Sequence, residues 1–210
     1  MPTPYAYFQG NIVPLSEAKI GVMTHAFNYG TAVFEGIRGN WNDDDQTTYL
    51  FRLREHFERL GQSSKILTLQ MHQAVDQLCE IAVELVERSG FTEDVYLRPM
   101  VYLSSEQLGV RLHNLESDTL IFLTPFPAYL PEVARCHTST WRRVQDTGIP
   151  PRAKVTGIYV NSALAKSEAN ANGFDEAIML NENGHVSEGS GENIFMVRDG
   201  RLITPTPADN

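Results

Sequence analysis

The chain has 210 residues, of which 42% are hydrophobic and 20% are charged, a composition typical of a globular protein that can bury a sizeable core. Its 17 Lys and Arg against 26 Asp and Glu give a formal net charge of -9, which repels phosphate backbones and anionic membrane surfaces, so we expect no nucleic-acid partner. Residues 1–10 have neither the basic start nor the apolar run of a signal peptide. No stretch of the sequence approaches the roughly 18 apolar residues of a membrane span. We therefore expect a cytoplasmic protein with no membrane partner.

The first 45 residues predict strands and an acidic loop. Residues 5–8 and 11–13 are short apolar runs, which are typical of a hairpin. Residues 25–38 are rich in aromatic and β-branched side chains but are interrupted by glycines, so we expect a strand that lines a pocket. The acidic run at residues 43–45 favours a solvated loop over a cation site, and we predict no metal.

Two helices are expected next. Residues 49–52 predict a strand that leads into a helix beginning near Leu53, which places Arg52 at the junction. Residues 71–89 predict a second helix, which Gly90 ends. Its apolar stripe, which we expect to face the core, consists of Val75, Leu78, Cys79, Ala82, Leu85 and Val86.

A strand is predicted for residues 94–103, with Tyr96, Arg98 and Met100 on one face because successive side chains alternate. A half-buried arginine needs a partner, whereas an edge strand would leave Arg98 in water or paired with an acid. The sequence alone leaves both interpretations open. Residues 119–124 predict another buried strand.

A proline-rich stretch divides the chain. Residues 125–131 contain three prolines, which can continue neither a sheet nor a helix. We therefore predict a first domain at residues 1–124, a linker at residues 125–135 and a second domain at residues 136–210.

The second domain is expected to mix strands with one helix. The alanine-rich helix should cover residues 158–172 and end at Gly173. The predicted strands are residues 137–142, 177–180, 193–197 and 202–204, with turns at Asn183–Gly184 and Asp199–Gly200. Cys79 and Cys136 have no spacing that suggests a metal or a disulfide, so we expect two free core thiols.

Two stretches carry candidate chemistry, one with an amine and one with an acid. Lys154 has small or apolar neighbours, which would disfavour its ammonium form and leave an amine able to attack a carbonyl. The alternative is a solvated surface lysine. Glu188 lies beside Gly189 and Gly191, which allow a turn close to a ligand, so its carboxylate could hold a protonated ring nitrogen.

Sequence blocks spread along most of the chain carry a family resemblance. They occur in the order THAFNYGTAVFEGIRG (24–39), LFRLREHFERL (50–60), VYLRPMVY (95–102), AKVTGIYVNSALA (153–165) and VSEGSGENIFMV (186–197). With these blocks the chain resembles the branched-chain amino acid aminotransferases, which are fold-type IV enzymes dependent on pyridoxal 5'-phosphate. The resemblance implies an α/β (α+β) fold of two domains, an N-terminal α/β sandwich and a C-terminal barrel-like α/β domain.

The resemblance also implies which residues hold the cofactor. Lys154 would form a Schiff base with pyridoxal 5'-phosphate and then carry a proton. Glu188 would face the pyridine nitrogen, and Tyr159 would donate a hydrogen bond to the phenolic oxygen. Arg52 would bind the 5'-phosphate through its planar fork.

On the substrate side, one site must accept both an aliphatic side chain and the distal carboxylate of glutamate or 2-oxoglutarate. By resemblance, Arg98 and Tyr29 would meet the distal carboxylate, and Tyr96 would help to hold the α-carboxylate. The residues implied for the apolar wall are Phe34, Tyr29, Tyr129 and Val110, with Gly36 leaving room. In the family the loop that carries Val110 reaches in from a neighbouring subunit, which implies a homodimer or a higher homo-oligomer.

Other interpretations remain open. A D-amino acid transaminase, an R-selective amine transaminase or an aminodeoxychorismate lyase would share Lys154, Tyr159 and Glu188. Family members continue well beyond Asn210, so we expect an incomplete second domain, weak cofactor retention and an exposed apolar face if the molecule ends there. A non-catalytic fragment is then an alternative, as is a cofactor-free lyase that uses Lys154.

Overall fold

A computed structural model describes residues 3–126 and 130–209 and divides into two compact units. The N-terminal unit comprises Met1–Pro127 together with Ala153–Gly157, and the C-terminal unit comprises Ala128–Arg152 with Ile158–Asn210. The prediction had assigned residues 153–157 to the second domain. They belong to the N-terminal unit because their backbone pairs with it: the Phe34 amide donates to the Lys154 carbonyl at 3.0 Å, and Val33 bridges to Val155.

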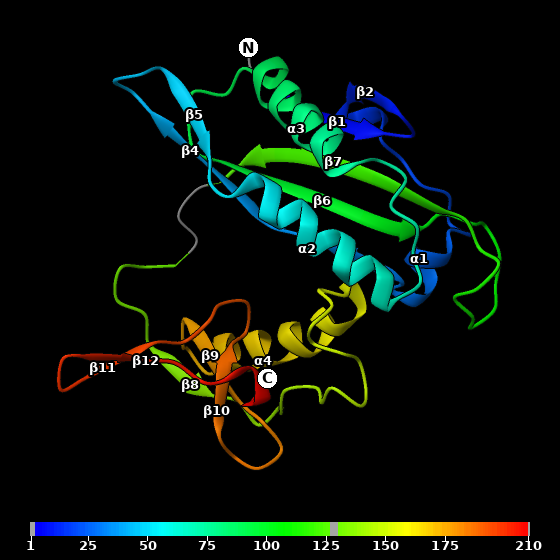
Figure 1. Cartoon of the computed structure of the whole chain (residues 1–210). Coiled ribbons are helices and arrows are strands. Elements are labelled where there is room, and N and C mark those ends of the chain that lie inside the picture. Colours follow the sequence, from blue (N-terminus) through cyan, green and yellow to red (C-terminus); the bar gives the residue numbers. More distant parts are fainter. Residues whose placement is uncertain (1–2, 127–129, 210) are drawn as a thin grey trace. The chain divides into compact units, whose positions relative to one another are not determined.

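An antiparallel sheet forms the N-terminal unit (Figure 1). Its strands run in the order β2-β1-β7-β6-β4-β5, and β3 also pairs with β6. The bounds are β1 Tyr5–Phe8, β2 Asn11–Pro14, β3 Ala32–Phe34, β4 Ile37–Asn42, β5 Thr47–Leu50, β6 Val95–Leu103 and β7 Ser117–Pro125. The predicted hairpin of β1 and β2 is confirmed.

Helices α2 (Leu53–Ile66) and α3 (Val75–Ser89) lie across the sheet in Figure 1 and contact β1, β3, β6 and β7. Their apolar stripes are fully buried at Phe57, Leu60, Leu78, Ala82 and Leu85. On the sheet they meet the odd-numbered residues of β6, since Leu97, Val101 and Leu103 are also fully buried. The core of this unit therefore lies between the helices and one face of the sheet.

Two predictions for this unit need correction, and the position of the strand at residues 94–103 in the sheet, which the sequence left open, is decided. Residues 25–38 are not one strand, because residues 25–29 form the short helix α1 (His25–Tyr29), which ends at Gly30 with φ 65°. Helix α3 begins at Val75 rather than at residue 71, because Gln70 and His72 hydrogen-bond to Ser117 and hold that segment against β7. Strand β6 is central rather than an edge, since it pairs with β7 on one side and with β3 and β4 on the other.

The C-terminal unit contains a sheet of order β10-β9-β8, in which β8 and β9 are parallel, and a separate β11–β12 hairpin. A small apolar cluster of Ala165, Ala169, Ala177, Met179 and Phe174 joins α4 to β9. The bounds are β8 Cys136–Thr138, η2 Thr156–Ile158, α4 Tyr159–Ala171, β9 Glu176–Leu180, β10 Val186–Gly189, β11 Met196–Arg198, β12 Arg201–Ile203 and η3 Pro207–Asp209. A further short helix, η1 (Leu15–Glu17), follows β2 in the N-terminal unit.

The helix before Gly173 and the two glycine turns are confirmed, with positive φ at Gly184 and at Asp199–Gly200. Strand β10 was missed, because its glycines had suggested a loop. Cys136 is exposed, not a core thiol, although both cysteines are free. Within residues 3–126 and 130–209, none of the helices is long and apolar enough to span a membrane, and no His, Cys, Asp and Glu group could hold a metal ion.

Candidate functional site

The face of the N-terminal sheet that α2 and α3 leave uncovered carries the predicted substrate residues. Strands β3 and β4 pair with β6 in one register, with Phe34 opposite Met100 and Ile37 opposite Leu97. Because side chains alternate along a strand and paired residues share a face, Phe34 and Gly36 lie on the same face as Tyr96 and Arg98. This surface, formed by Phe34, Gly36, Tyr96, Arg98 and Met100, is called the open face below.

Arg98 is held in place on the open face by two aromatic side chains. Its guanidinium carbon lies 4.2 Å from the centre of the Phe34 ring, and its Nε and Nη2 donate to the Tyr96 hydroxyl oxygen at 3.2 and 3.0 Å. The Tyr96 ring stacks on Phe126 with centroids 5.1 Å apart. Within the described residues Arg98 makes no salt bridge with a carboxylate, so it presents a half-buried positive charge that can receive an anionic ligand.

Gly36 is required by Tyr96. A Cβ atom at position 36 would lie 2.3 Å from the Tyr96 hydroxyl oxygen and 3.0 Å from Cζ. The prediction that Gly36 leaves room is therefore refined, because the room it leaves is occupied by the tyrosine that holds Arg98.

Lys154 reaches the open face on the segment 153–157. The lysine carbonyl accepts from the Phe34 amide, and the Thr156 hydroxyl donates to the Gly30 carbonyl at 2.9 Å. Ala153 and Val155 are buried on either side, while Lys154 itself is half-buried with Nζ 5.2 Å from the centre of the Phe34 ring. The lysine amine and the Arg98 guanidinium thus lie against the same aromatic ring.

Arg52 lies immediately before α2 in a left-handed backbone conformation, with φ 54° and ψ 41°. Its side chain is 61% exposed and pairs with Glu55 at 2.9 Å. The N-cap residue makes no side-chain capping hydrogen bond at this helix end, so the first backbone amides and the exposed Arg52 fork can both receive an anion.

Tyr29 is attached to the loop that carries Val110. Its hydroxyl oxygen accepts from the Gly109 amide at 3.0 Å, and His25 Nε2 lies 2.7 Å from the Gly109 carbonyl oxygen. The Val110 side chain is 90% exposed, so it does not line the open face of its own chain. Tyr129, the remaining predicted wall residue, lies outside the described residues.

The C-terminal unit holds Glu188 and Tyr159. Glu188, in β10, forms a salt bridge with Arg143, and both side chains are largely buried. The Arg143 amide donates to the Leu180 carbonyl of β9 at 2.9 Å, which fixes the arginine beside the strand pair. Tyr159 is the first residue of α4 and is half-buried.

Sequence reasoning missed Arg143 and Glu176. The buried Glu176 carboxylate pairs with Lys166 and accepts hydrogen bonds from the Ala177 and Ser190 amides, so it holds the loop that follows Glu188. Burial would raise the pKa of Glu176, but the hydrogen bonds from Lys166 and the two amides lower it below its ordinary value. Arg143 lies in none of the sequence blocks, and no local pattern marks it.

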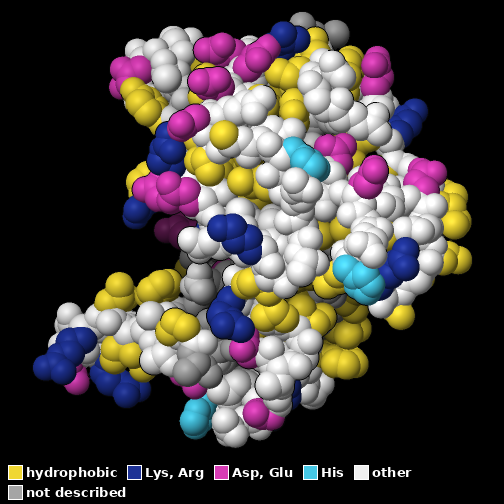
Figure 2. Space-filling model, turned by 45° about the vertical axis from the view of Figure 1, so that its right-hand side comes forward, with side chains coloured by type: hydrophobic (Ala, Val, Ile, Leu, Met, Phe, Trp, Pro, Cys, Tyr) yellow, Lys and Arg dark blue, Asp and Glu magenta, His cyan; other side chains and the backbone are white. Residues whose placement is uncertain are grey.

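The surface charge is mixed. On the side of the molecule drawn in Figure 2, Lys and Arg side chains are interspersed with Asp and Glu side chains. This distribution fits the net charge of -9.

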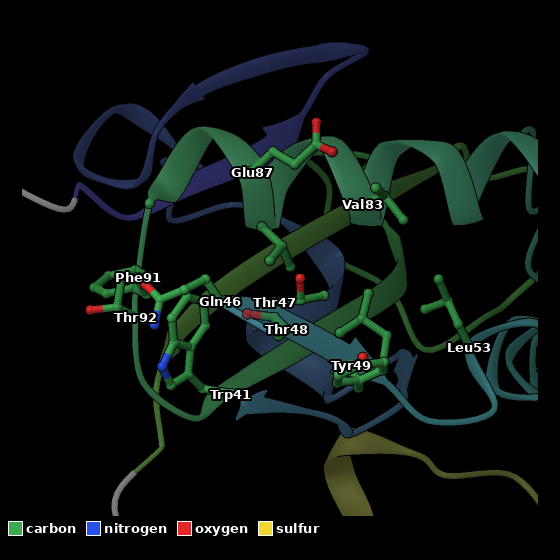
Figure 3. A pocket seen from close by; sticks show the side chains of 13 residues that line it. Trp41, Gln46, Thr47, Thr48, Tyr49, Leu53, Val83, Glu87, Phe91 and Thr92 are labelled. Carbon is green, nitrogen blue, oxygen red and sulfur yellow. The ribbon is translucent and has the colours of Figure 1, made fainter. Parts of the chain in front are cut away.

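A hollow of about 630 Å³ lies elsewhere on the N-terminal unit, between the β4–β5 hairpin and α3 (Figure 3). It is lined mainly by apolar and hydroxyl side chains, among them Trp41, Tyr49, Val83 and Phe91. Glu87 is its one charged lining residue among those described, and none of the predicted site residues borders it. The open face, rather than this hollow, has groups suited to chemistry.

Comparison with known proteins identifies the family. Residues 32–210 match the model of the family described as amino-transferase class IV. The chain belongs to the class IV aminotransferases. Enzymes of this family use pyridoxal 5'-phosphate as their cofactor.

The similar class IV aminotransferases include a curated protein of Aquifex aeolicus named a probable branched-chain-amino-acid aminotransferase. It is 45% identical over 98% of this chain and 67% of its own length. The structure of a branched-chain aminotransferase from Thermoproteus uzoniensis with norvaline matches with a TM-score of 0.94 at 45% identity, over 99% of this chain and 69% of that one. The holo form of the branched-chain amino acid aminotransferase from Thermobaculum terrenum matches with a TM-score of 0.91 at 35% identity, over 100% and 69%. The chain thus spans about two thirds of the length of these relatives.

The donor groups of this class IV chain fit the cofactor. An aldehyde needs an amine, which Lys154 offers beside an apolar ring, and a phosphate needs a fork of donors such as Arg52 at a helix start. A protonated ring nitrogen needs a carboxylate, and Glu188 is held in place by Arg143.

Proposed function

We propose that this chain takes part in transamination between the branched-chain L-amino acids leucine, isoleucine and valine and 2-oxoglutarate, giving branched-chain 2-oxo acids and L-glutamate. The observation that carries the proposal is the shared Phe34 ring, with Lys154 Nζ 5.2 Å and the Arg98 guanidinium carbon 4.2 Å from its centre. An amine beside an apolar wall suits an aliphatic amino acid, and a nearby cation suits the second carboxylate of glutamate. Two chemically different substrates can therefore use one site.

Four residues are assigned to the cofactor in this proposal. Pyridoxal 5'-phosphate, when bound, supplies an electron sink for the negative charge left on the substrate Cα. The Lys154 amine would hold the cofactor aldehyde and, as a neutral amine, would accept the proton from the substrate Cα. Arg52 binds the phosphate, Tyr159 donates to the phenolic oxygen, and Glu188 keeps the ring nitrogen protonated.

The substrate residues act through charge and exclusion of water. Arg98, with the Tyr29 hydroxyl, binds the distal carboxylate of glutamate, and Tyr96 helps to hold the α-carboxylate. Phe34 forms the apolar wall, and Gly36 is needed because it lets Tyr96 approach Arg98. Because the wall excludes water, the Arg98 charge interacts more strongly with a carboxylate than it would in solution.

We further propose that a second copy of the chain covers an apolar patch around α1 and the loop near Gly109, giving a homodimer or a higher homo-oligomer. The patch contains large exposed side chains, with Val22 79%, Phe27 67%, Leu108 64% and Val110 90% exposed. The bridge between Thr24 and Glu106 holds its two segments together. An exposed patch of this kind marks an interface, and Val110 would then reach the partner's site. The expected location in the cytoplasm remains a prediction from the sequence.

A half-reaction panel tests the function. The chain is loaded with pyridoxal 5'-phosphate, and leucine, isoleucine and valine should each bleach the visible absorption of the bound cofactor. A response only to D-alanine or to R-amines would identify a different transaminase of the same fold. Failure to bind the cofactor at all would favour a non-catalytic fragment. Borohydride reduction followed by peptide mapping should place the label on Lys154, and Lys166, which also lies in an ion pair, serves as the internal control.

A further inference from the structure

One buried carboxylate lies directly behind the open face. Glu35 stands between Phe34 and Gly36 in the chain, but alternation along the strand points its side chain to the opposite face of the sheet, toward α2. Its side chain is fully buried. Its backbone amide donates to the Pro99 carbonyl at 2.9 Å, which keeps this segment in register with β6 although regular pairing is interrupted there.

Helix α2 supplies every partner recorded for the Glu35 carboxylate. Arg59 donates two hydrogen bonds, from Nε and Nη2, each at 2.5 Å, and His56 Nδ1 lies 2.9 Å from the second carboxylate oxygen. Burial alone would raise the pKa of Glu35, but the hydrogen bonds from His56 and Arg59 outweigh it, so the pKa lies below its ordinary value. The group is therefore an ionised carboxylate in the core, and it depends on α2 for its stability.

The same helix carries Arg52 at its start. His56 lies one turn after Arg52, and its amide donates to the Arg52 carbonyl at 3.2 Å. The Glu35 carboxylate thus connects the first turns of α2 to the segment between β3 and β4 that carries Gly36 and follows Phe34. A shift of this helix along or away from the sheet would move Arg52 relative to the open face.

We propose that Glu35 is a positioning residue that fixes Arg52 relative to the open face through His56 and Arg59. This inference rests on the proposed function, because Arg52 matters only if it binds the cofactor phosphate. Glu35 touches neither the cofactor nor the substrate. Its effect should therefore be confined to the part of cofactor affinity that depends on the phosphate.

The test compares two probes, pyridoxal 5'-phosphate and pyridoxal, which lacks the phosphate. Dissociation constants are measured by absorption titration, without amino acids, for the unchanged chain and for Glu35→Gln. If Glu35 positions Arg52, Glu35→Gln should raise the dissociation constant for pyridoxal 5'-phosphate by about tenfold. Replacing a residue that orients a binding group commonly has an effect of this size. Pyridoxal affinity should change by less than about twofold, so the preference for the phosphorylated probe falls.

Two further variants serve as controls, one at the same contact and one at the surface. His56→Asn weakens one of the contacts to Glu35 and leaves the Arg59 pair. It should therefore give a smaller fall in the preference for pyridoxal 5'-phosphate over pyridoxal. If Glu35→Gln does not fold, His56→Asn tests the positioning role in its place. Glu84→Gln breaks an exposed ion pair with Arg88 on α3 and should leave both constants unchanged.

The results separate the two hypotheses. If Glu35→Gln and His56→Asn lower the affinity for pyridoxal 5'-phosphate and for pyridoxal equally, or leave the preference between the two probes unchanged, the positioning role is overturned. The proposed function would remain intact. Equal affinity for the two probes in the unchanged chain, or no binding of either probe, would overturn the phosphate role of Arg52 and the positioning role with it.

Discussion

The two units each bury one glutamate carboxylate close to predicted site residues, and they satisfy it in different ways. In the N-terminal unit, Glu35 relies on side chains of one helix, Arg59 and His56. In the C-terminal unit, Glu176 pairs with Lys166 and also accepts hydrogen bonds from two backbone amides, those of Ala177 and Ser190. Backbone donors remain when a side chain is replaced, whereas side-chain donors do not. The first carboxylate is therefore expected to be more sensitive to substitution of its cation.

Arg59→Met should have the largest effect, because it leaves the fully buried Glu35 with His56 as its one recorded side-chain donor. We expect the free energy of unfolding, measured with urea on the N-terminal transition, to fall by about 3 kcal/mol. Arg54 also lies on α2 and forms an exposed pair with Asp76 of α3, so Arg54→Met is the matched control and should cost no more than about 1 kcal/mol. Equal losses in the two variants would contradict the comparison.

Gly36→Ala separates the open face from the buried carboxylate behind it. The added Cβ would meet the Tyr96 hydroxyl, which must move and release Arg98. We expect 2-oxoglutarate to bind about tenfold more weakly, which corresponds to about 1.4 kcal/mol, in a titration of the loaded protein. Gly148→Ala, where the new Cβ would make only ordinary contacts with the Gln145 carbonyl oxygen at 3.4 Å and with Val144 at 3.5 Å, should leave the affinity unchanged. Unaltered binding in Gly36→Ala would show that Tyr96 can shift without affecting Arg98.

Lys166→Met tests the other half of the comparison. Because Glu176 keeps its two backbone amides, we expect a loss of about 1 kcal/mol in the free energy of unfolding, clearly smaller than that of Arg59→Met. The measurement is urea unfolding followed by a probe in the C-terminal unit, such as Trp141 fluorescence. A loss as large as that of Arg59→Met would mean that the backbone amides contribute little.

The smallest effect is a dependence on pH. The folded-state pKa of Glu35 is lowered, so its stabilisation is complete above the unfolded value of about 4.3 and is lost as the pH falls through the folded pKa. The difference in melting temperature between the unchanged chain and Glu35→Gln should therefore be largest near pH 6 and shrink below about pH 4. A difference that stays constant down to about pH 3 would indicate that folding does not lower the pKa of Glu35.

Strong periodic signals in the sequence predicted the fold well. The alternation of Tyr96, Arg98 and Met100 correctly gave their common face, and the stripe of α3 and the turn at Asp199–Gly200 were also correct. Helix α1 was missed because its five residues are too few to show a helical period. Strand β10 was missed because glycines weaken the strand pattern, although tertiary pairing with β9 overrides it.

The site was predicted less completely than the fold. The sequence blocks indicated Phe34, Gly36, Arg98 and Lys154, which the structure places on or against the open face. The roles of Arg52, Tyr159 and Glu188 remain predictions. Glu35 lies inside one of the sequence blocks but received no role, and Glu176 and Arg143 lie in none of them. A single charged residue has no local pattern that distinguishes a buried ion pair from a solvent-facing position.

The common register of β3 and β4 against β6 has a consequence for how this protein can change. Along these strands, odd-numbered residues such as Val33, Leu97 and Val101 are buried toward α2 and α3. On the other face Phe34 is also buried, and Met100 packs against the cluster of Phe8, Ala32 and Tyr102. A substitution at an even position can therefore change the open face without disturbing the packing against α2 and α3, but it removes packing on its own side of the sheet. A library randomised at Phe34 and Met100 would accordingly have to be selected for folding as well as for specificity.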